Sequence, residues 1–218
     1  GACAIGEALK INKSLQTLGL TCPHLFPEEV ISIAEALKTN TSLKNLSLKQ
    51  YFIIHFHGNN SGPEGACAIG EALKKNTSLV KLVLRCIPIG PLGGIAIAEA
   101  LKTNTSLQTL NFNSKNIGEN GAFAIAQALK TNSSLQTLDY SYARIVPEGA
   151  CAIGEALKIN KSLQTLGLTC PHLFPEEVIS IAEALKTNTS LKNLSLKQYF
   201  IIHFHGNNSG PEGACAIG

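Results

Sequence analysis

The chain has 218 residues, of which 44% are hydrophobic and 15% are charged, enough to bury a continuous core without metals or disulfides. Its 18 basic and 15 acidic side chains give a formal net charge of +3, without the concentrated positive charge by which nucleic-acid binders displace counterions. No run approaches the roughly 18 to 20 consecutive apolar residues of a membrane span. We therefore expect neither a nucleic-acid partner nor a membrane partner.

Internal repetition organises the sequence. Residues 1–70 recur unchanged at residues 149–218, and within them a shorter unit begins with Ser-Leu-x-x-Leu-x-Leu. Successive units start 28 residues apart, except for one unit of 36. The sequence predicts one array over residues 1–218, made of partial, complete and truncated units at 1–13, 14–41, 42–77, 78–105, 106–133, 134–161, 162–189 and 190–218. Since the chain lacks methionine and both starts and stops on GACAIG, we expect it to be a piece of a longer protein.

Each unit begins with a segment of period two. In SLQTLGL, which starts at Ser14, Leu18 and Leu20 alternate with the polar or small residues Thr17 and Gly19. Alternation of this kind is typical of a strand with one buried face. The sequence therefore predicts one strand at the start of every unit.

The second half of each unit has a helical period. At residues 121–132, Ile125 and Leu129 lie four residues apart among good helix formers. Proline followed by an acidic residue marks helix starts at Pro27, Pro63 and Pro147. Lys-x-Asn marks the helix ends. Asn-x-Ser sequons occur in these turns at Asn40, Asn76, Asn104, Asn132 and Asn188, and we attribute them to the repeated turn rather than to glycosylation.

Stacking of the units predicts the fold. One unit buries too few aliphatic side chains to offset the conformational entropy lost on ordering, so its neighbours must cover it. Strand beside strand gives a parallel sheet, with the helices on the other side. Because helices are about 10 Å wide and strands lie about 4.8 Å apart, the stack curves. The predicted fold class is an α/β solenoid, shaped like a horseshoe, with the sheet on the concave face and the helices on the convex face.

The 36-residue unit carries eight extra residues directly after its strand. The segment KQYFIIHFHGNN spans residues 49–60 and recurs at 197–208. Exposed aromatic and large apolar side chains are natural anchors for a protein partner, which makes candidates of Tyr51, Phe52, Ile54 and Phe56. Two alternatives remain open: the segment covers the edge of its own strand, or it is an artefact of the gene model.

The repeated unit closely resembles a known repeat class. LxxLxL, an IG-x-x-G turn and GAxAIAEALKxNTSL are similar to the ribonuclease-inhibitor-like class of leucine-rich repeat, as found in NOD-like receptors, and the likeness extends over the whole chain. The chain departs from this class at one position, three residues after the last strand leucine. The family usually places Asn or Cys there, in a hydrogen-bonded ladder, whereas this chain has Pro23, Ile87, Lys115 and Ala143. We expect a looser loop there, satisfied by water or local hydrogen bonds.

Partner binding in a solenoid usually uses the strand positions that point out of the concave face. These positions are basic in the early strands and grade into an amide-rich, weakly acidic region. The predicted partner-binding residues are Lys49, Lys81, Arg85, Asn111, Asn113 and Asp139. The alternative is an ordinary solvated sheet face.

The sequence predicts no metal, no cofactor and no catalytic residues. His55 and His57 could supply two metal ligands, but no nearby Asp, Glu or Cys completes a site. Neither a Gly-x-x-x-x-Gly-Lys loop nor a Gly-x-Ser-x-Gly elbow occurs. We therefore expect a protein that is not an enzyme.

The seven cysteines fall on two repeat positions, one in the helix and one after the strand. Cys22 and Cys86 are predicted to lie two strands apart, about 9 to 10 Å, beyond the roughly 7 Å between Cα atoms that a disulfide tolerates. We expect buried thiols, a reducing compartment and a cytoplasmic protein.

The resemblance implies a non-catalytic scaffold for protein interaction or ligand sensing, within a larger NOD-like-receptor-type protein, that binds a protein partner on its concave face. Two alternatives stand beside it. Ran GTPase-activating proteins carry the same repeat class, and Arg85 and Arg144 are the two arginines that could act as cationic fingers. The unchanged duplication also fits a passive array without a single partner.

Overall fold

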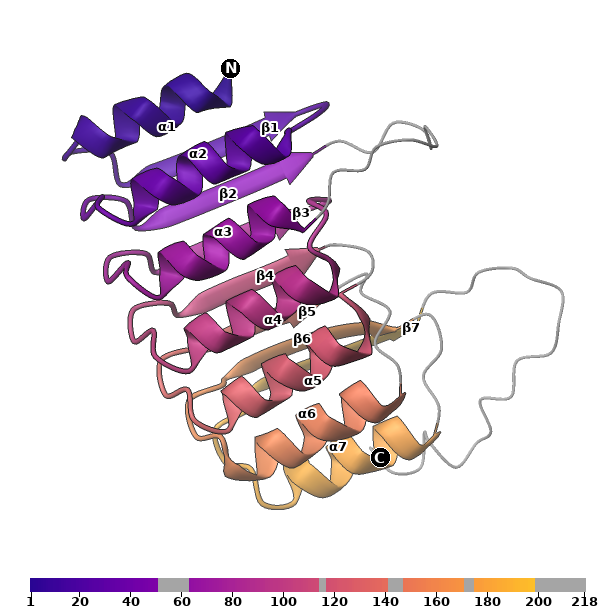
Figure 1. The fold of residues 1–218 in the computed structure, drawn as a ribbon. Helices are drawn as coiled ribbons and strands as arrows, with labels where there is room; N and C mark the ends of the chain where they lie inside the picture. Colours follow the sequence, from indigo (N-terminus) through magenta and orange to yellow (C-terminus); the bar gives the residue numbers. More distant parts are fainter. Residues whose placement is uncertain (51–62, 114–116, 141–146, 171–174, 199–218) are drawn as a thin grey trace, which may run out of the picture.

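Helices and strands alternate through the whole structure, a computed structural model that describes residues 1–50, 63–113, 117–140, 147–170 and 175–198. The strands pair side by side in chain order, all parallel, in one sheet. The helices follow the outer side of the curved stack and the strands its inner side (Figure 1). The predicted α/β solenoid is confirmed, and none of the described helices is long and apolar enough to cross a membrane.

The elements follow the repeat. The helices are α1 (Ala2–Ile11), α2 (Pro27–Leu37), α3 (Glu64–Leu73), α4 (Gly90–Leu101), α5 (Gly118–Leu129), α6 (Pro147–Ile159) and α7 (Pro175–Leu185). The strands are β1 (Thr17–Cys22), β2 (Asn45–Gln50), β3 (Lys81–Arg85), β4 (Thr109–Asn113), β5 (Thr137–Tyr140), β6 (Thr165–Cys170) and β7 (Asn193–Gln198). As predicted, α2 and α6 begin on proline, and Pro63 directly precedes α3.

The core lies between the sheet and the helices. Equivalent leucines are in register across the sheet, so that Leu46, Leu82 and Leu110 line up on adjacent strands and are at most 1% exposed. One isoleucine per helix meets them from the other side, and the fully buried examples include Ile33 and Ile125. Repetition of the sequence thus becomes repetition of one packing layer.

Glu–Lys pairs cover the outer side of the helices, which we call the convex face. Among the described residues, six helices carry an ion pair three residues apart, and Glu35–Lys38, Glu99–Lys102 and Glu183–Lys186 are examples. In α3 the hydrogen bond from Lys74 lowers the pKa of the Glu71 carboxyl, and the positive charges of nearby lysines lower it further. Charge on the convex face is therefore largely neutralised within the molecule.

A ladder of asparagines joins the turns between each helix and the next strand. In each rung the side-chain amide donates to two carbonyl oxygens of the preceding unit, while its Oδ1 atom accepts from two backbone amides of its own turn. For Asn104 the acceptors are the oxygens of Leu73 at 2.8 Å and Asn76 at 2.9 Å, and the donors are the amides of Ser106 at 3.0 Å and Leu107 at 2.8 Å. The rungs of this asparagine ladder are Asn40, Asn76, Asn104, Asn132, Asn160 and Asn188.

The asparagine ladder lies at the edge of the sheet where the strands begin. The positions that depart from the leucine-rich repeat pattern, such as Pro23 and Ile87, lie at the other edge, where the strands end. The first five rungs are 1 to 6% exposed, which agrees with our interpretation of the sequons as turn residues. The 36-residue unit does not interrupt the ladder, since Asn76 donates to Leu37 at 2.7 Å and to Asn40 at 3.0 Å.

The cysteines are less buried than we expected. Cys3 is exposed, while Cys22, Cys67, Cys86 and Cys151 are half-buried. The prediction of buried thiols is wrong for all five. Cys3 is more exposed than Cys67 and Cys151 at the same helix position, because α3 and α6 have a described helix on each side and α1 has one on one side only. Partial burial raises the pKa of Cys67, and the nearby carboxylates of Glu64 and Glu71 raise it further.

Candidate functional site

The outward side chains of the sheet form three rows that run across the strands on the concave face. The first row consists of Thr17, Asn45, Lys81, Thr109, Thr137, Thr165 and Asn193. The second consists of Gly19, Ser47, Val83, Asn111, Asp139, Gly167 and Ser195. By strand register the third comprises Thr21, Lys49, Arg85 and Asn113 on β1 to β4, and Thr169 and Lys197 on β6 and β7; the structure describes only the backbone of Asn113 and Thr169.

These rows border a shallow hollow of about 730 Å³. Five of the six predicted concave residues line it, namely Lys49, Lys81, Arg85, Asn111 and Asp139. The side chain of Asn113 lies outside the described part of the structure, although its backbone continues β4. The predicted insertion residues Tyr51, Phe52, Ile54 and Phe56 also lie outside the described residues.

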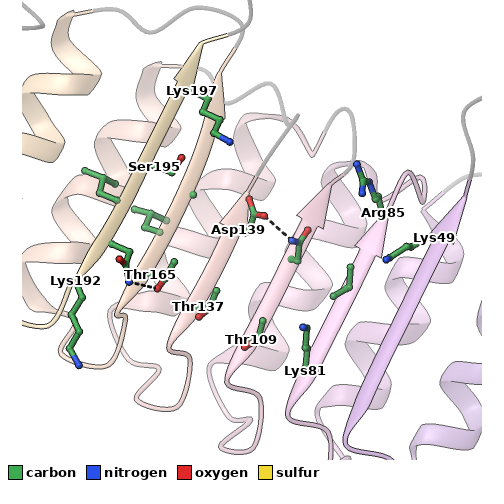
Figure 2. Close-up of a pocket in the computed structure, with 16 residues that line it drawn as sticks. Lys49, Lys81, Arg85, Thr109, Thr137, Asp139, Thr165, Lys192, Ser195 and Lys197 are labelled. Carbon is green, nitrogen blue, oxygen red and sulfur yellow. Dashed lines mark hydrogen bonds between the residues drawn. The ribbon is translucent and has the colours of Figure 1, made fainter. Parts of the chain in front are cut away.

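Positive charge gathers at the ends of β2 and β3. Lys49 and Arg85 are register partners on these strands, and their side chains lie beside each other at the rim of the hollow (Figure 2). Lys81 adds a third cation at the start of β3. Among the described residues, no carboxylate forms an ion pair with any of the three. Like charges side by side on adjacent strands destabilise a sheet unless a counter-charge meets them.

Asp139 is the one carboxylate among the described residues that line the hollow. Asn111, on the preceding strand, donates a hydrogen bond to its Oδ2 atom at 2.8 Å (Figure 2). On the other side, its Oδ1 atom lies 2.9 Å from the place where a Cβ atom on Gly167 would be. The glycine therefore makes room for the carboxylate, and a larger residue at position 167 would push it away.

The hollow also contains residues that the site prediction does not name. Lys192, Lys197 and Gly167 line it, and the lysines place positive charge at the β7 end. The signal is present in the sequence, because Lys197 is the duplicate of Lys49. The predicted set of concave residues extends only as far as the fifth strand.

The site is equipped for recognition by charge and hydrogen bonding. Its lining side chains are mainly lysines, an arginine, threonines and amides. Among the described residues, no group of three or more His, Cys, Asp or Glu side chains could hold a metal ion.

Solved structures share this architecture. The structure of "Leiomodin-1 Actin-Binding Site 2 (ABS2)" matches with a TM-score of 0.57 and 24% identity, over 71% of this chain and 86% of its own. The fold is that of a leucine-rich repeat solenoid. A tropomodulin C-terminal domain from Caenorhabditis elegans matches with a TM-score of 0.51 and 14% identity, over 86% of this chain and 92% of its own. No family model matches the chain, and no curated protein does.

Proposed function

We propose that this chain is a non-catalytic scaffold that binds a protein partner on its concave face. The observation that carries the proposal is the contrast between its two faces. The convex face pairs its own charges, whereas Lys49, Lys81 and Arg85 meet no carboxylate among the described residues. Cations of this kind around a polar hollow are suited to steer and orient a partner.

Quantitative affinity capture tests the use of the concave face. The bait would be the whole chain, compared with a variant that carries Lys81→Glu and Arg85→Glu. The matched control carries Lys102→Glu and Lys186→Glu on the convex face, which changes the net charge equally. We expect the concave variant to lose specific proteins that the wild type and the control both retain. Equal capture by all three baits would contradict the proposal.

Actin is the first partner to test by name. The similar Leiomodin-1 structure is that of an actin-binding site of that protein, which makes actin a defined probe for the present chain. Co-sedimentation with actin filaments would measure binding directly. Binding that weakens in the concave variant, and not in the control, supports actin as the partner, whereas no co-sedimentation removes actin from the candidates.

We propose further that the chain serves as a sensing module in a larger, cytoplasmic NOD-like-receptor-type protein. The resemblance of the repeat unit supports this assignment. Sequencing the transcript beyond both ends of the present chain tests it, since an attached nucleotide-binding domain is expected. Its absence from the full transcript would favour a free-standing scaffold or a passive array.

Arg85 supports a second candidate function. Its side chain is exposed at the end of β3, where a guanidinium could reach the phosphates of a GTPase-bound nucleotide, as a regulator of the Ran GTPase-activating type would require. Single-turnover GTP hydrolysis, measured with wild type and with Arg85→Ala, tests this function. Acceleration that depends on Arg85 would support it, and no acceleration across several small GTPases would exclude it.

A further inference from the structure

We infer that the concave face binds an extended acidic peptide segment, which lies across the strands with one group of carboxylates at Lys49 and Arg85 and a second at Lys197. This inference rests on the proposed function and specifies the chemistry of the partner. It concerns the third row of the concave face, which carries Lys49 and Arg85 on β2 and β3 and Lys197 on β7.

Charge complementarity supports an acidic occupant. Among the described residues that line the hollow there are five cations, Lys49, Lys81, Arg85, Lys192 and Lys197, and one carboxylate, Asp139. That carboxylate already accepts a hydrogen bond from Asn111. A partner that brings carboxylates to the Lys49–Arg85 pair would relieve the repulsion between the two cations, and its binding would be favoured by a contact that the described residues do not supply.

The spacing of the cations sets the length of the segment. From β3 to β7 there are four strand intervals, or about 19 Å along the sheet at about 4.8 Å each. An extended chain advances about 3.3 to 3.6 Å per residue. Carboxylates that contact both cation groups would therefore be separated by about six residues.

The arrangement favours a peptide over a nucleic acid. A phosphate backbone carries negative charge at every nucleotide and would pass Asp139 in the middle of the hollow, where the like charges repel. The described positions of the three rows also contain no aromatic side chain on which a base could stack. Moreover, the cations that line the hollow are grouped at its two ends instead of forming a continuous track.

Fluorescence anisotropy with the whole chain tests the inference. The probe is a labelled peptide with two Glu-Glu pairs separated by about six residues of Gly and Ser. One control peptide has the same composition with all four glutamates together, and another has Gln in place of Glu. A single-stranded oligonucleotide of similar length is the fourth probe. We expect the spaced peptide to bind at least about tenfold more tightly than the Gln peptide and severalfold more tightly than the clustered one, with affinity that falls as salt rises.

Matched variants locate the binding. Lys49→Gln with Arg85→Gln should weaken binding of the spaced peptide about tenfold or more, and Lys197→Gln alone should weaken it severalfold. The control, Lys102→Gln with Lys186→Gln, removes the same charge from the convex face and should change the affinity less than twofold. Circular dichroism verifies that every variant is folded, and the single variant Arg85→Gln serves if the double variant is not.

The outcomes separate this inference from the proposed function. Equal binding of the spaced and clustered peptides, equal weakening by concave and convex variants, or tighter binding of the oligonucleotide would each overturn the inference. If the peptides fail while a captured protein still requires Lys81 and Arg85, the partner uses other chemistry and the proposed function stands. If neither peptide nor protein binding depends on the concave residues, both fail.

Discussion

At the scale of single residues, the asparagine of each helix-to-strand turn is the most heavily bonded polar side chain of its unit. It connects two neighbouring units through its amide and shapes its own turn through its oxygen. Because the rungs in the middle of the array are almost fully buried, the backbone groups that they satisfy have no access to water as a substitute. One side chain therefore determines both the turn and the junction.

Removal of one internal rung should be costly. Asn104→Ala deletes four hydrogen bonds to backbone groups and leaves these buried groups unsatisfied, so we expect the free energy of unfolding to fall by about 2 to 4 kcal/mol. Asn12→Ala is the matched control, since Asn12 is exposed and its Oδ1 atom accepts from the backbone amides of Ser14 and Leu15. Urea denaturation should show a loss below about 1 kcal/mol for the control. Similar losses for both variants would refute the role of the ladder.

Thiol reactivity should differ between two cysteines at the same repeat position. Cys3 is exposed, whereas Cys67 is half-buried with a raised pKa. A raised pKa means a smaller thiolate fraction near neutral pH, and the thiolate is the nucleophile. We expect iodoacetamide at pH 7.5 to modify Cys3 several times faster than Cys67, as measured by mass spectrometry of the tryptic peptides, which differ in length. Equal rates would show that burial at α3 does not protect the thiol.

At the scale of elements, close contact between neighbouring helices depends on glycines. A Cβ atom on Gly70 of α3 would lie 2.6 Å from the backbone carbon of Ala96 in α4. The equivalent glycines Gly6 and Gly154 are equally confined, against Ser32 and Ser180. At the α3–α4 junction Gly93 is confined as well, since a Cβ atom there would lie 2.6 Å from the Cβ of Ala66, so close approach of these two helices depends on glycines in both.

A larger side chain at position 70 should push the helices apart. We expect Gly70→Val to lower the free energy of unfolding by about 1 to 3 kcal/mol, because the contact is with backbone that cannot rotate away. Gly19→Val on β1 is the control, since a Cβ atom there meets nothing within 4 Å and valine suits a strand. Thermal or urea denaturation compares the two. A control as unstable as Gly70→Val would point to a general effect of valine.

The elements also show what the sequence alone could predict. Alternating leucines predict the strands, and the helical period, together with Pro-Glu starts in some units, predicts the helices, because period and capping are local signals. The concave residues followed from alternation, which is why five of the six lie around the hollow. The asparagine ladder was missed because its acceptors belong to the preceding unit: Leu73 and Asn104 are 31 residues apart, and only the stacked structure brings them together. Gly167 was missed for the same reason, since its role depends on Asp139 of the neighbouring strand.

At the scale of the whole molecule, identical sequences occupy different surroundings. Residues 17–22 form β1, which pairs with one neighbour among the described strands, while their exact duplicate, residues 165–170, forms β6 between two. Leu18 and Leu20 are half-buried in β1, whereas Leu166 and Leu168 are at most 1% exposed. Neighbours alone account for this difference.

Hydrogen exchange should reveal the difference within one peptide. A proteolytic peptide common to both copies has one mass and one set of intrinsic exchange rates, so any difference comes from protection. We expect its isotopic envelope to split into two populations of equal intensity, the faster from β1 and the slower from β6. A single envelope throughout the time course would mean that the array opens as one unit.

The position of the asparagine ladder also governs how such a protein can change in length during evolution. When an entire repeat is gained or lost, each asparagine can still bond to the unit that now precedes it. Deletion of a few residues between a helix and its following strand would instead move the asparagine amide away from the carbonyl oxygens that it binds. The edge of the sheet where the strands end is not subject to this constraint, since the eight additional residues between β2 and α3 leave Asn76 bonded like the other rungs. Natural variants of this chain should therefore differ by whole repeats or by loops on that permissive side.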